Sequence, residues 1–197
     1  MTSNQLTLPA FPLKNVLLPG EATKLHIFEE RYKELVKDCI ENNASFAIPY
    51  MDNGKLGEFG CEVKIKNVIK EYADGRKDIL VECVNVFKIL EFSELLSPKL
   101  YGAVMVEFEN VNTLITNAAL QDAVIHYFSS IQNKIIDYDT VSKLSVYNVA
   151  ASLQLSPQEK LDLIIAKNKQ TVLLNQLKFI MHIIHSEEKL NNRFMFN

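Results

Sequence analysis

The spacing of apolar residues changes once along this chain of 197 residues, and this change constrains the fold more than any other feature. From residue 8 to about residue 110, apolar and polar residues alternate, which is the period of strands with one buried face. After about residue 112, apolar residues recur every three or four positions, as in helices. The sequence therefore predicts an α+β protein with a β-rich part, residues 1–112, and a helical part, residues 113–197.

The clearest strand signals surround Asp74-Gly75, which predicts a hairpin turn because glycine adopts positive φ at no steric cost. Residues 61–66 alternate between apolar and charged side chains, so we expect Glu62 on the solvent face. The run 78–90 carries apolar residues on both faces and predicts a central strand covered on both sides. Pro49 cannot donate to a ladder, so we expect its segment at an edge or a bulge.

One helix is expected inside the β-rich part, over about residues 28–43. The helical part predicts further helices over 114–135, 140–154 and 169–191. Between the last two, Ser156 is placed to cap a helix that begins at the next residue, with Glu159 bonding back to it. The expected apolar stripe of the first helix consists of Tyr32, Leu35, Val36, Cys39 and Ile40.

The composition excludes several classes of protein. A hydrophobic fraction of 48% suits a globular chain, and a net charge of −3 gives no general attraction to polyanions. No window approaches the roughly 18 consecutive apolar residues of a membrane span. The first residues carry no basic segment followed by an apolar run, so no secretory signal is predicted and we expect a cytoplasmic protein.

The three cysteines, Cys39, Cys61 and Cys83, are widely spaced. An odd number without close pairs argues against a disulfide framework and against a thiolate zinc site. We expect all three to be small buried apolar residues in a reducing compartment.

Several short segments follow one another in a fixed order and resemble a known family. The segments are Phe11-Pro12-Leu13, Pro19-Gly20, Phe28-Glu29, Arg31-Tyr32, Asp74-Gly75-Arg76, Ala150, Leu153, Ser156 and Glu159-Lys160-Leu161. This order resembles the amino-terminal, substrate-binding domain of Lon proteases along nearly the whole chain. The resemblance implies a PUA-like β pseudo-barrel with one helix, followed by a C-terminal α-helical bundle.

Catalytic motifs of Lon are not found in the sequence. Full-length Lon continues into an ATPase and a Ser–Lys peptidase, whereas this chain ends at Asn197. None of the six glycines fits a Walker A loop, and the glycine-rich segment 54–60 predicts a turn between strands. We therefore expect a stand-alone, non-catalytic domain without a cofactor.

Two histidine arrangements could carry chemistry. His182, His185 and Glu188 share one helix face, but a zinc site needs more ligands, so we expect a polar helix end without a metal. His26 precedes two carboxylates, yet no nucleophile accompanies it at a recognisable spacing. We expect His26 to end a strand and Arg31 to pair with a nearby carboxylate.

A basic edge on the predicted hairpin is the basis of an alternative function. It consists of Lys64, Lys66, Lys70, Arg76 and Lys77. PUA-like folds often bind RNA, so this edge allows a nucleic-acid-binding reading by fold analogy. Interleaved carboxylates cancel much of the charge and no aromatic platform is evident, so a solvated strand face is the simpler reading.

Apolar residues in loops and at the chain end are candidates for polypeptide binding. The segment around Pro49 could be an open edge that accepts a partner strand. Exposed apolar patches often mark binding sites. The candidate residues are Tyr50, Met51, Phe59, Phe194 and Phe196.

Three functional hypotheses follow from the sequence. The first is a binding module for unfolded or extended polypeptide, acting as an adaptor or regulator beside a protease or chaperone. The second is an RNA-binding domain that uses the basic edge. The third is an enzyme or carrier for a small molecule at the junction of the two parts.

Overall fold

The computed structural model describes residues 5–194, and the side chains of residues 5–186. By internal contacts the chain forms two units. The first unit extends to Val111 and includes Ala151–Ile164; the second comprises Asn112–Ala150 and the residues from Ile165 onward. The segment Ala151–Ile164 thus belongs to the first unit, which contains the strands, although its apolar spacing is helical. The predicted division of the chain at residue 112 stays a prediction.

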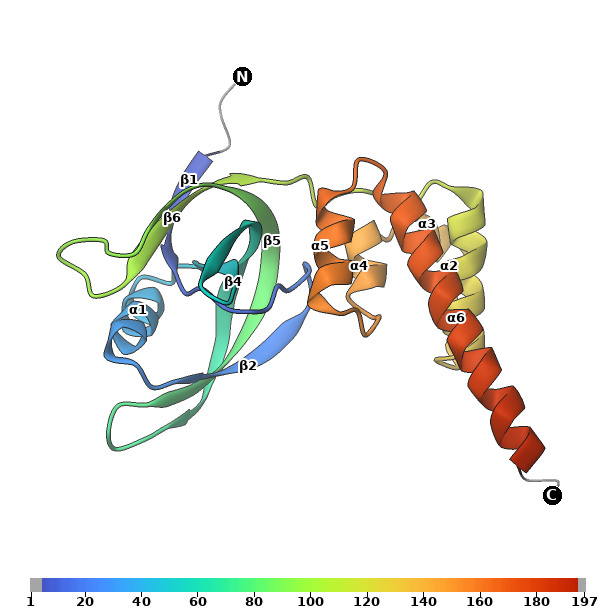
Figure 1. The fold of residues 1–197 in the computed structure, drawn as a ribbon, viewed down its shortest axis with the longest axis horizontal. Coiled ribbons are helices and arrows are strands. Elements are labelled where there is room, and N and C mark those ends of the chain that lie inside the picture. The colour runs from blue at the N-terminus through green and yellow to red at the C-terminus, as the bar shows by residue number, and fades with distance from the viewer. Residues whose placement is uncertain (1–4, 195–197) are drawn as a thin grey trace. The chain divides into compact units, whose positions relative to one another are not determined.

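The first unit is built on a six-stranded sheet with the order β2-β5-β4-β3-β1-β6. An additional pairing of β5 with β6 closes β1, β3, β4, β5 and β6 into a ring, and β2 remains outside it (Figure 1). Neighbouring strands are antiparallel except β1 and β3. The strands are β1 (Gln5–Ala10), β2 (Ala22–Ile27), β3 (Phe46–Asp52), β4 (Lys55–Glu71), β5 (Lys77–Ser93) and β6 (Gly102–Phe108).

The length of β5 allows the ring to close. One edge of this 17-residue strand pairs with β4, while its other edge serves two partners in succession. Residues 77–82 pair with β2, and residues 87–93 pair with β6. Register shifts after Glu62 and Ile89 bend the long strands, as bulges do in barrels. The predicted central position of the 78–90 strand is confirmed, but its expected cover on both faces is wrong at Lys88 and Leu90, which are exposed.

Two hairpin turns use residues with positive φ. Between β3 and β4, Asn53 and Gly54 have φ of 50° and 74°, as a two-residue type I′ turn requires. Between β4 and β5, Gly75 has φ of 82° and its N–H donates to the carbonyl of Tyr72. The predicted turns at residues 74–75 and at the start of segment 54–60 are confirmed.

Before residue 112 the described chain forms one helix, α1 (Glu30–Glu41), near the predicted position. Tyr32, Leu35, Val36 and Cys39 are buried as expected. Ile40 is a correction to the predicted stripe, because 43% of it is exposed. The last turn of α1 lies beside an outer edge of β4 that carries no further strand within residues 5–194, so nothing described covers this side chain.

Two further expectations for the β-rich part are wrong. Glu62 does not face solvent: it is 8% exposed and accepts hydrogen bonds from Ser45 Oγ and, at 2.7 Å, from Asn85 Nδ2. Pro49 does not lie on an open edge, because β3 is flanked by β4 and β1. The alternative expectation of a bulge is confirmed by the register shift between Pro49 and Met51.

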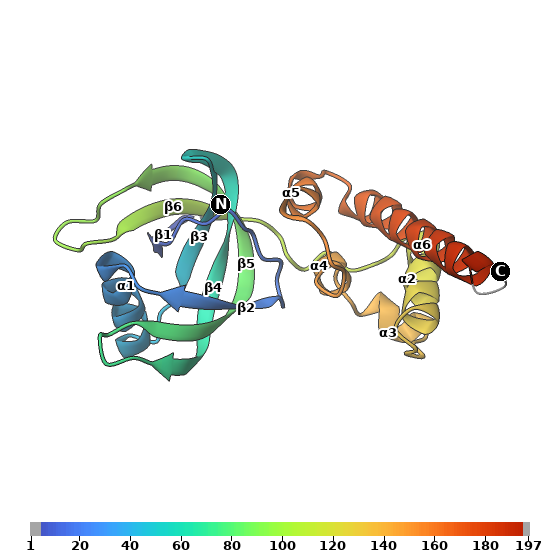
Figure 2. The same ribbon diagram turned by 60° about the horizontal axis from the view of Figure 1, so that its bottom comes forward.

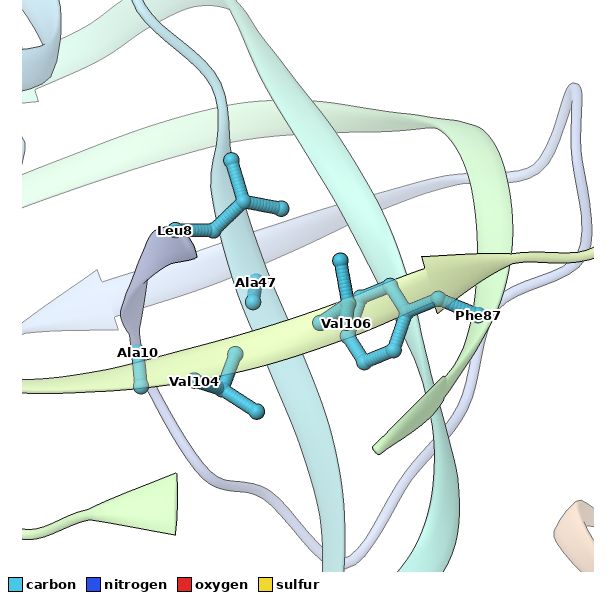
Figure 3. Close-up of a cluster of buried hydrophobic side chains, with 6 residues drawn as sticks. All are labelled: Leu8, Ala10, Ala47, Phe87, Val104 and Val106. Atoms are coloured by element: carbon cyan, nitrogen blue, oxygen red, sulfur yellow. The ribbon is translucent and has the colours of Figure 1, made fainter. Parts of the chain in front are cut away.

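The core of the ring lies between strands that are distant in sequence. Figure 3 shows the side chains of Leu8, Ala10, Ala47, Phe87, Val104 and Val106, which β1, β3, β5 and β6 contribute to one buried cluster. Full burial of such side chains stabilises the fold by about 1.5–3 kcal/mol for each large one. The three cysteines are buried as predicted, and their thiols are free.

The second unit is helical. α2 (Ala118–Ser130) packs along α6 (Lys169–Phe194), which continues well past it (Figures 1 and 2). The predicted helix over 140–154 is instead two short helices, α3 (Tyr138–Ser142) and α4 (Val146–Ala150), because a turn at residues 143–145 separates them. Among the described residues no helix has the length and apolarity needed to cross a membrane.

The helix α5 (Pro157–Ile165) begins where the sequence predicts. Ser156 Oγ donates to Glu159 Oε2 at 2.7 Å and accepts the Glu159 N–H at 3.3 Å. The Ser156 N–H also donates to the Glu159 carboxylate at 2.7 Å. This reciprocal arrangement is a capping box, and it confirms the predicted helix start.

Candidate functional site

A pocket of about 550 Å³ opens at the side of the ring, within the first unit. We call it the barrel pocket. Its walls come from residues 11–13 after β1, residues 24–26 of β2 and Phe28 just before α1, with Met51 of β3, Phe92 of β5, Gly102 of β6 and Glu94 just after β5. Glu29, Arg31 and Tyr32 complete the lining.

The pocket runs along the outer edge of β2. Successive residues of a strand face opposite sides of the sheet, so a pocket lined by residues 24, 25 and 26 follows the edge rather than one face. β2 is the terminal strand of the sheet order, and β5 is the one described strand that pairs with it. Its outer edge therefore has backbone groups that can hydrogen-bond to another chain.

Phe28 stands at the rim of the pocket with 59% of its surface exposed. Its ring stacks on His26 at a centroid distance of 6.0 Å and an interplanar angle of 24°. His26 Nδ1 lies 2.6 Å from Asp78 Oδ1, and Tyr72 Oη donates to Asp78 Oδ2 at 2.8 Å. These bonds to His26 and Tyr72 lower the pKa of Asp78 and hold the imidazole under Phe28.

The floor of the pocket is aromatic. The rings of Phe11 and Tyr32 lie 4.1 Å apart, and burial raises the pKa of the Tyr32 phenol. The guanidinium of Arg31 lies 4.5 Å from the centroid of the Tyr32 ring and 2.8 Å from the Glu29 carboxylate. The predicted pairing of Arg31 with a nearby carboxylate and the position of His26 near a strand end are confirmed.

The predicted binding residues are only partly brought together. Met51 lines the barrel pocket, whereas Tyr50 is half-buried and Phe59 is 8% exposed, so little of Phe59 is available to a ligand. The side chain of Phe194 and the whole of Phe196 lie outside the described residues. The binding roles of Tyr50, Met51, Phe59, Phe194 and Phe196 stay predictions.

Sequence reasoning missed Phe28, His26 and Phe92 as members of one pocket. Two of its segments, residues 11–13 and 28–32, stood out in the sequence only as a mark of the family. One signal in the sequence could have indicated Phe28. It lies directly before the charged residues that begin a helix, and it does not belong to the apolar stripe of that helix.

Residues of the other two candidate sites, the histidines of α6 and the basic edge, make hydrogen bonds or ion pairs with nearby groups. His182 and His185 are exposed, and His185 Nδ1 lies 2.7 Å from the carbonyl of Met181. Within the described side chains no three His, Cys, Asp or Glu residues are grouped as a metal site would require. On the basic edge, Lys66 pairs with Glu82 at 2.7 Å, and Arg76 pairs with Asp74 at 2.7 Å.

A family model and two solved structures match this chain. The family model of the ATP-dependent protease La (LON) substrate-binding domain matches residues 7–189. The Lon N-terminal domain protein from Xanthomonas campestris is similar in structure, with a TM-score of 0.64 and 23% identity, over 88% of this chain and 98% of that one. The N-terminal domain of the Mycobacterium avium complex Lon protease has a TM-score of 0.59 and 16% identity, over 87% and 96%.

A comparison with curated proteins gave no match. The two structural likenesses establish the fold, a mixed sheet with a C-terminal helical region. The matched family model covers a substrate-binding domain and no ATPase or protease domain. Because that model spans most of the chain, this protein belongs to the Lon substrate-binding domain family.

Proposed function

We propose that this protein is a non-catalytic binding module for unfolded or extended polypeptide, and that the barrel pocket is its binding site. The observation that carries the proposal is the position of the pocket along the unpaired edge of β2. An extended chain placed there adds a strand to the sheet, and its backbone then supplies affinity that does not depend on sequence.

The side chains of the pocket favour a tolerant, partly apolar ligand. Phe28, which is 59% exposed, offers aromatic surface to apolar side chains beside the buried rings of Phe11 and Tyr32. Lys24 and Arg31 stand with Glu29 and Glu94 in the same lining, so the pocket carries both signs of charge. A mixed rim accepts many sequences, which is what a module for unfolded chains needs.

The residues of the pocket support binding rather than bond cleavage. No serine, threonine or cysteine is among its described lining residues. His26, the one imidazole in the described lining, is hydrogen-bonded to Asp78 and stacked on Phe28. Such a module suits an adaptor or regulator that hands polypeptide to a separate protease or chaperone.

Fluorescence anisotropy with a labelled, permanently unfolded polypeptide tests the proposal. The unchanged protein should bind with a dissociation constant in the tens of micromolar. Phe28→Ala should weaken binding about five- to thirtyfold, which corresponds to about 1–2 kcal/mol. The matched control is Leu95→Ala, because Leu95 is 60% exposed and does not line the pocket.

A second probe isolates the role of the β2 edge. A peptide methylated on alternate backbone nitrogens keeps its side chains but loses the donors that pair with a strand edge. It should bind several-fold more weakly than the unmethylated peptide. Saturable binding that responds neither to Phe28→Ala nor to methylation would contradict the proposed site, and no saturable binding would contradict the function.

A further inference from the structure

The outer edge of β4 is a further unpaired strand edge among the described residues of the first unit. β3 pairs with β4 only as far as the register Phe46 with Val63. Beyond Val63 the inner edge of β4 pairs with β5 to residue 71, whereas no strand of the described chain pairs with its outer edge. The residues from 64 onward therefore present unpaired backbone groups on that side.

A groove of about 290 Å³ follows this edge. One wall consists of residues 64–68 of β4, and the other of Cys39, Ile40, Asn43 and Ala44 at the end of α1. Five successive strand residues can line one groove only along the strand edge. We call it the α1–β4 groove; it is separate from the barrel pocket, with which it shares no lining residue.

The groove combines apolar surface with positive charge. Ile40 and Val68 are 43% and 39% exposed. Lys64 is exposed, and no acidic group of the described residues lies within ion-pair distance of it. Lys66 pairs with Glu82 yet keeps 53% of its side chain exposed. No Asp or Glu lines the groove.

A second copy of this chain fits the edge poorly. Antiparallel pairing of two such edges about Asn67 would place Lys64 opposite Lys70 of the other copy, and like charges directly opposite each other are destabilising. Lysines on exposed edges generally discourage this kind of self-association. The charge pattern is instead complementary to a strand that carries acidic residues.

We propose that the α1–β4 groove binds an extended acidic peptide segment of a partner protein. The segment adds a strand to β4, places carboxylates at alternate positions opposite Lys64 and Lys66, and buries an apolar side chain against Ile40 and Val68. This site goes beyond the proposed substrate site, because its ligand is selected by charge whereas the barrel pocket carries both signs of charge.

Isothermal titration with two synthetic peptides tests this inference. Both alternate valine with a charged residue; one carries glutamates and the other carries lysines at the same positions. The glutamate peptide should bind and the lysine peptide should not. Lys64→Glu should weaken the glutamate peptide about fivefold, whereas Lys178→Glu, an exposed control on α6 with the same change in net charge, should not.

Three further measurements fix the location. Ile40→Ala should weaken the glutamate peptide, and amide resonances of residues 64–68 should shift on its addition. Phe28→Ala should leave its affinity unchanged, so loss of binding in that variant would assign the peptide to the barrel pocket and overturn the groove. Equal binding of both peptides, or a dimer by sedimentation that Lys64→Glu strengthens, would also overturn the proposal.

Discussion

Lys160 Nζ lies 2.7 Å from Glu21 Oε2, with the two side chains 10% and 12% exposed. Lys160 belongs to α5, and Glu21 precedes β2, where its Oε2 also accepts the Leu18 N–H at 2.9 Å. One carboxylate oxygen thus connects α5 to the β-rich part of the first unit. This contact gives a physical reason for grouping residues 151–164 with the sheet.

Removing one member of this pair should destabilise the fold strongly. Lys160→Met leaves Glu21 as a largely buried carboxylate without its counter-charge, and the free energy of unfolding should fall by about 3 kcal/mol. Urea unfolding monitored by circular dichroism measures this change. The double variant Glu21→Gln/Lys160→Met should recover much of the loss, and a single variant within about 0.5 kcal/mol of the unchanged protein would contradict the assignment.

Gly60 should not tolerate a side chain. A Cβ at this position would lie 2.6 Å from the Ile48 carbonyl oxygen and 2.8 Å from the Phe87 ring. Gly60→Ala should therefore cost about 1–3 kcal/mol in thermal or urea unfolding. Gly57→Ala is the matched control, because its Cβ would meet mainly the movable ring of Tyr50, at 3.0 Å, and should cost less.

Asp78 should contribute to stability in a pH-dependent way. Its pKa is lowered by hydrogen bonds from His26 and then Tyr72, so in acid the unfolded chain takes up this proton before the folded chain does. The contribution is present above the unfolded pKa, near 3.9, and is lost as pH falls through the lower folded value. Melting temperatures from pH 7 to pH 2 should fall less steeply for Asp78→Asn; identical slopes would contradict this role.

The three thiols should be unreactive in the folded protein. Burial raises the pKa of Cys39 to about 12, and burial is also the largest cause of the raised pKa of Cys83. Since the thiolate is the reactive form, an aromatic disulfide reagent should label essentially no cysteine at pH 8. The same reagent in urea should label all three, and rapid labelling without denaturant would contradict the described burial.

Local signals made much of the fold predictable. The Asp74-Gly75 turn, the capping box of Ser156 and the buried side of α1 each depend on residues within one turn or one hairpin. The pairing of β5 with both β2 and β6 depends on residues far apart in sequence, and no spacing in the chain encodes it. The burial of Glu62 could not be predicted for the same reason, because its hydrogen-bond partners, Ser45 and Asn85, are distant from it in sequence.

The candidate site was less predictable than the fold. Met51 is recognisable in the sequence as an apolar residue near a turn, but its neighbours in the pocket come from five other segments of the chain. Phe28 differs from other apolar residues in the sequence only by its place directly before a helix, and its exposure becomes known only from the positions of β2 and α1. For Pro49 the sequence leaves an edge and a bulge equally open, because the partner on its second side, β1, lies some 40 residues away in the chain.

The closure of the ring through β5 and β6 affects how a polypeptide binds in the barrel pocket. Residues 11–13 leave β1, Met51 lies on β3, Phe92 on β5 and Gly102 on β6, so one wall of the pocket is part of the closed ring. Displacing this wall would break hydrogen bonds between the strands of the ring. This wall of the pocket is therefore preorganised, and the conformational entropy lost on binding comes chiefly from the bound polypeptide.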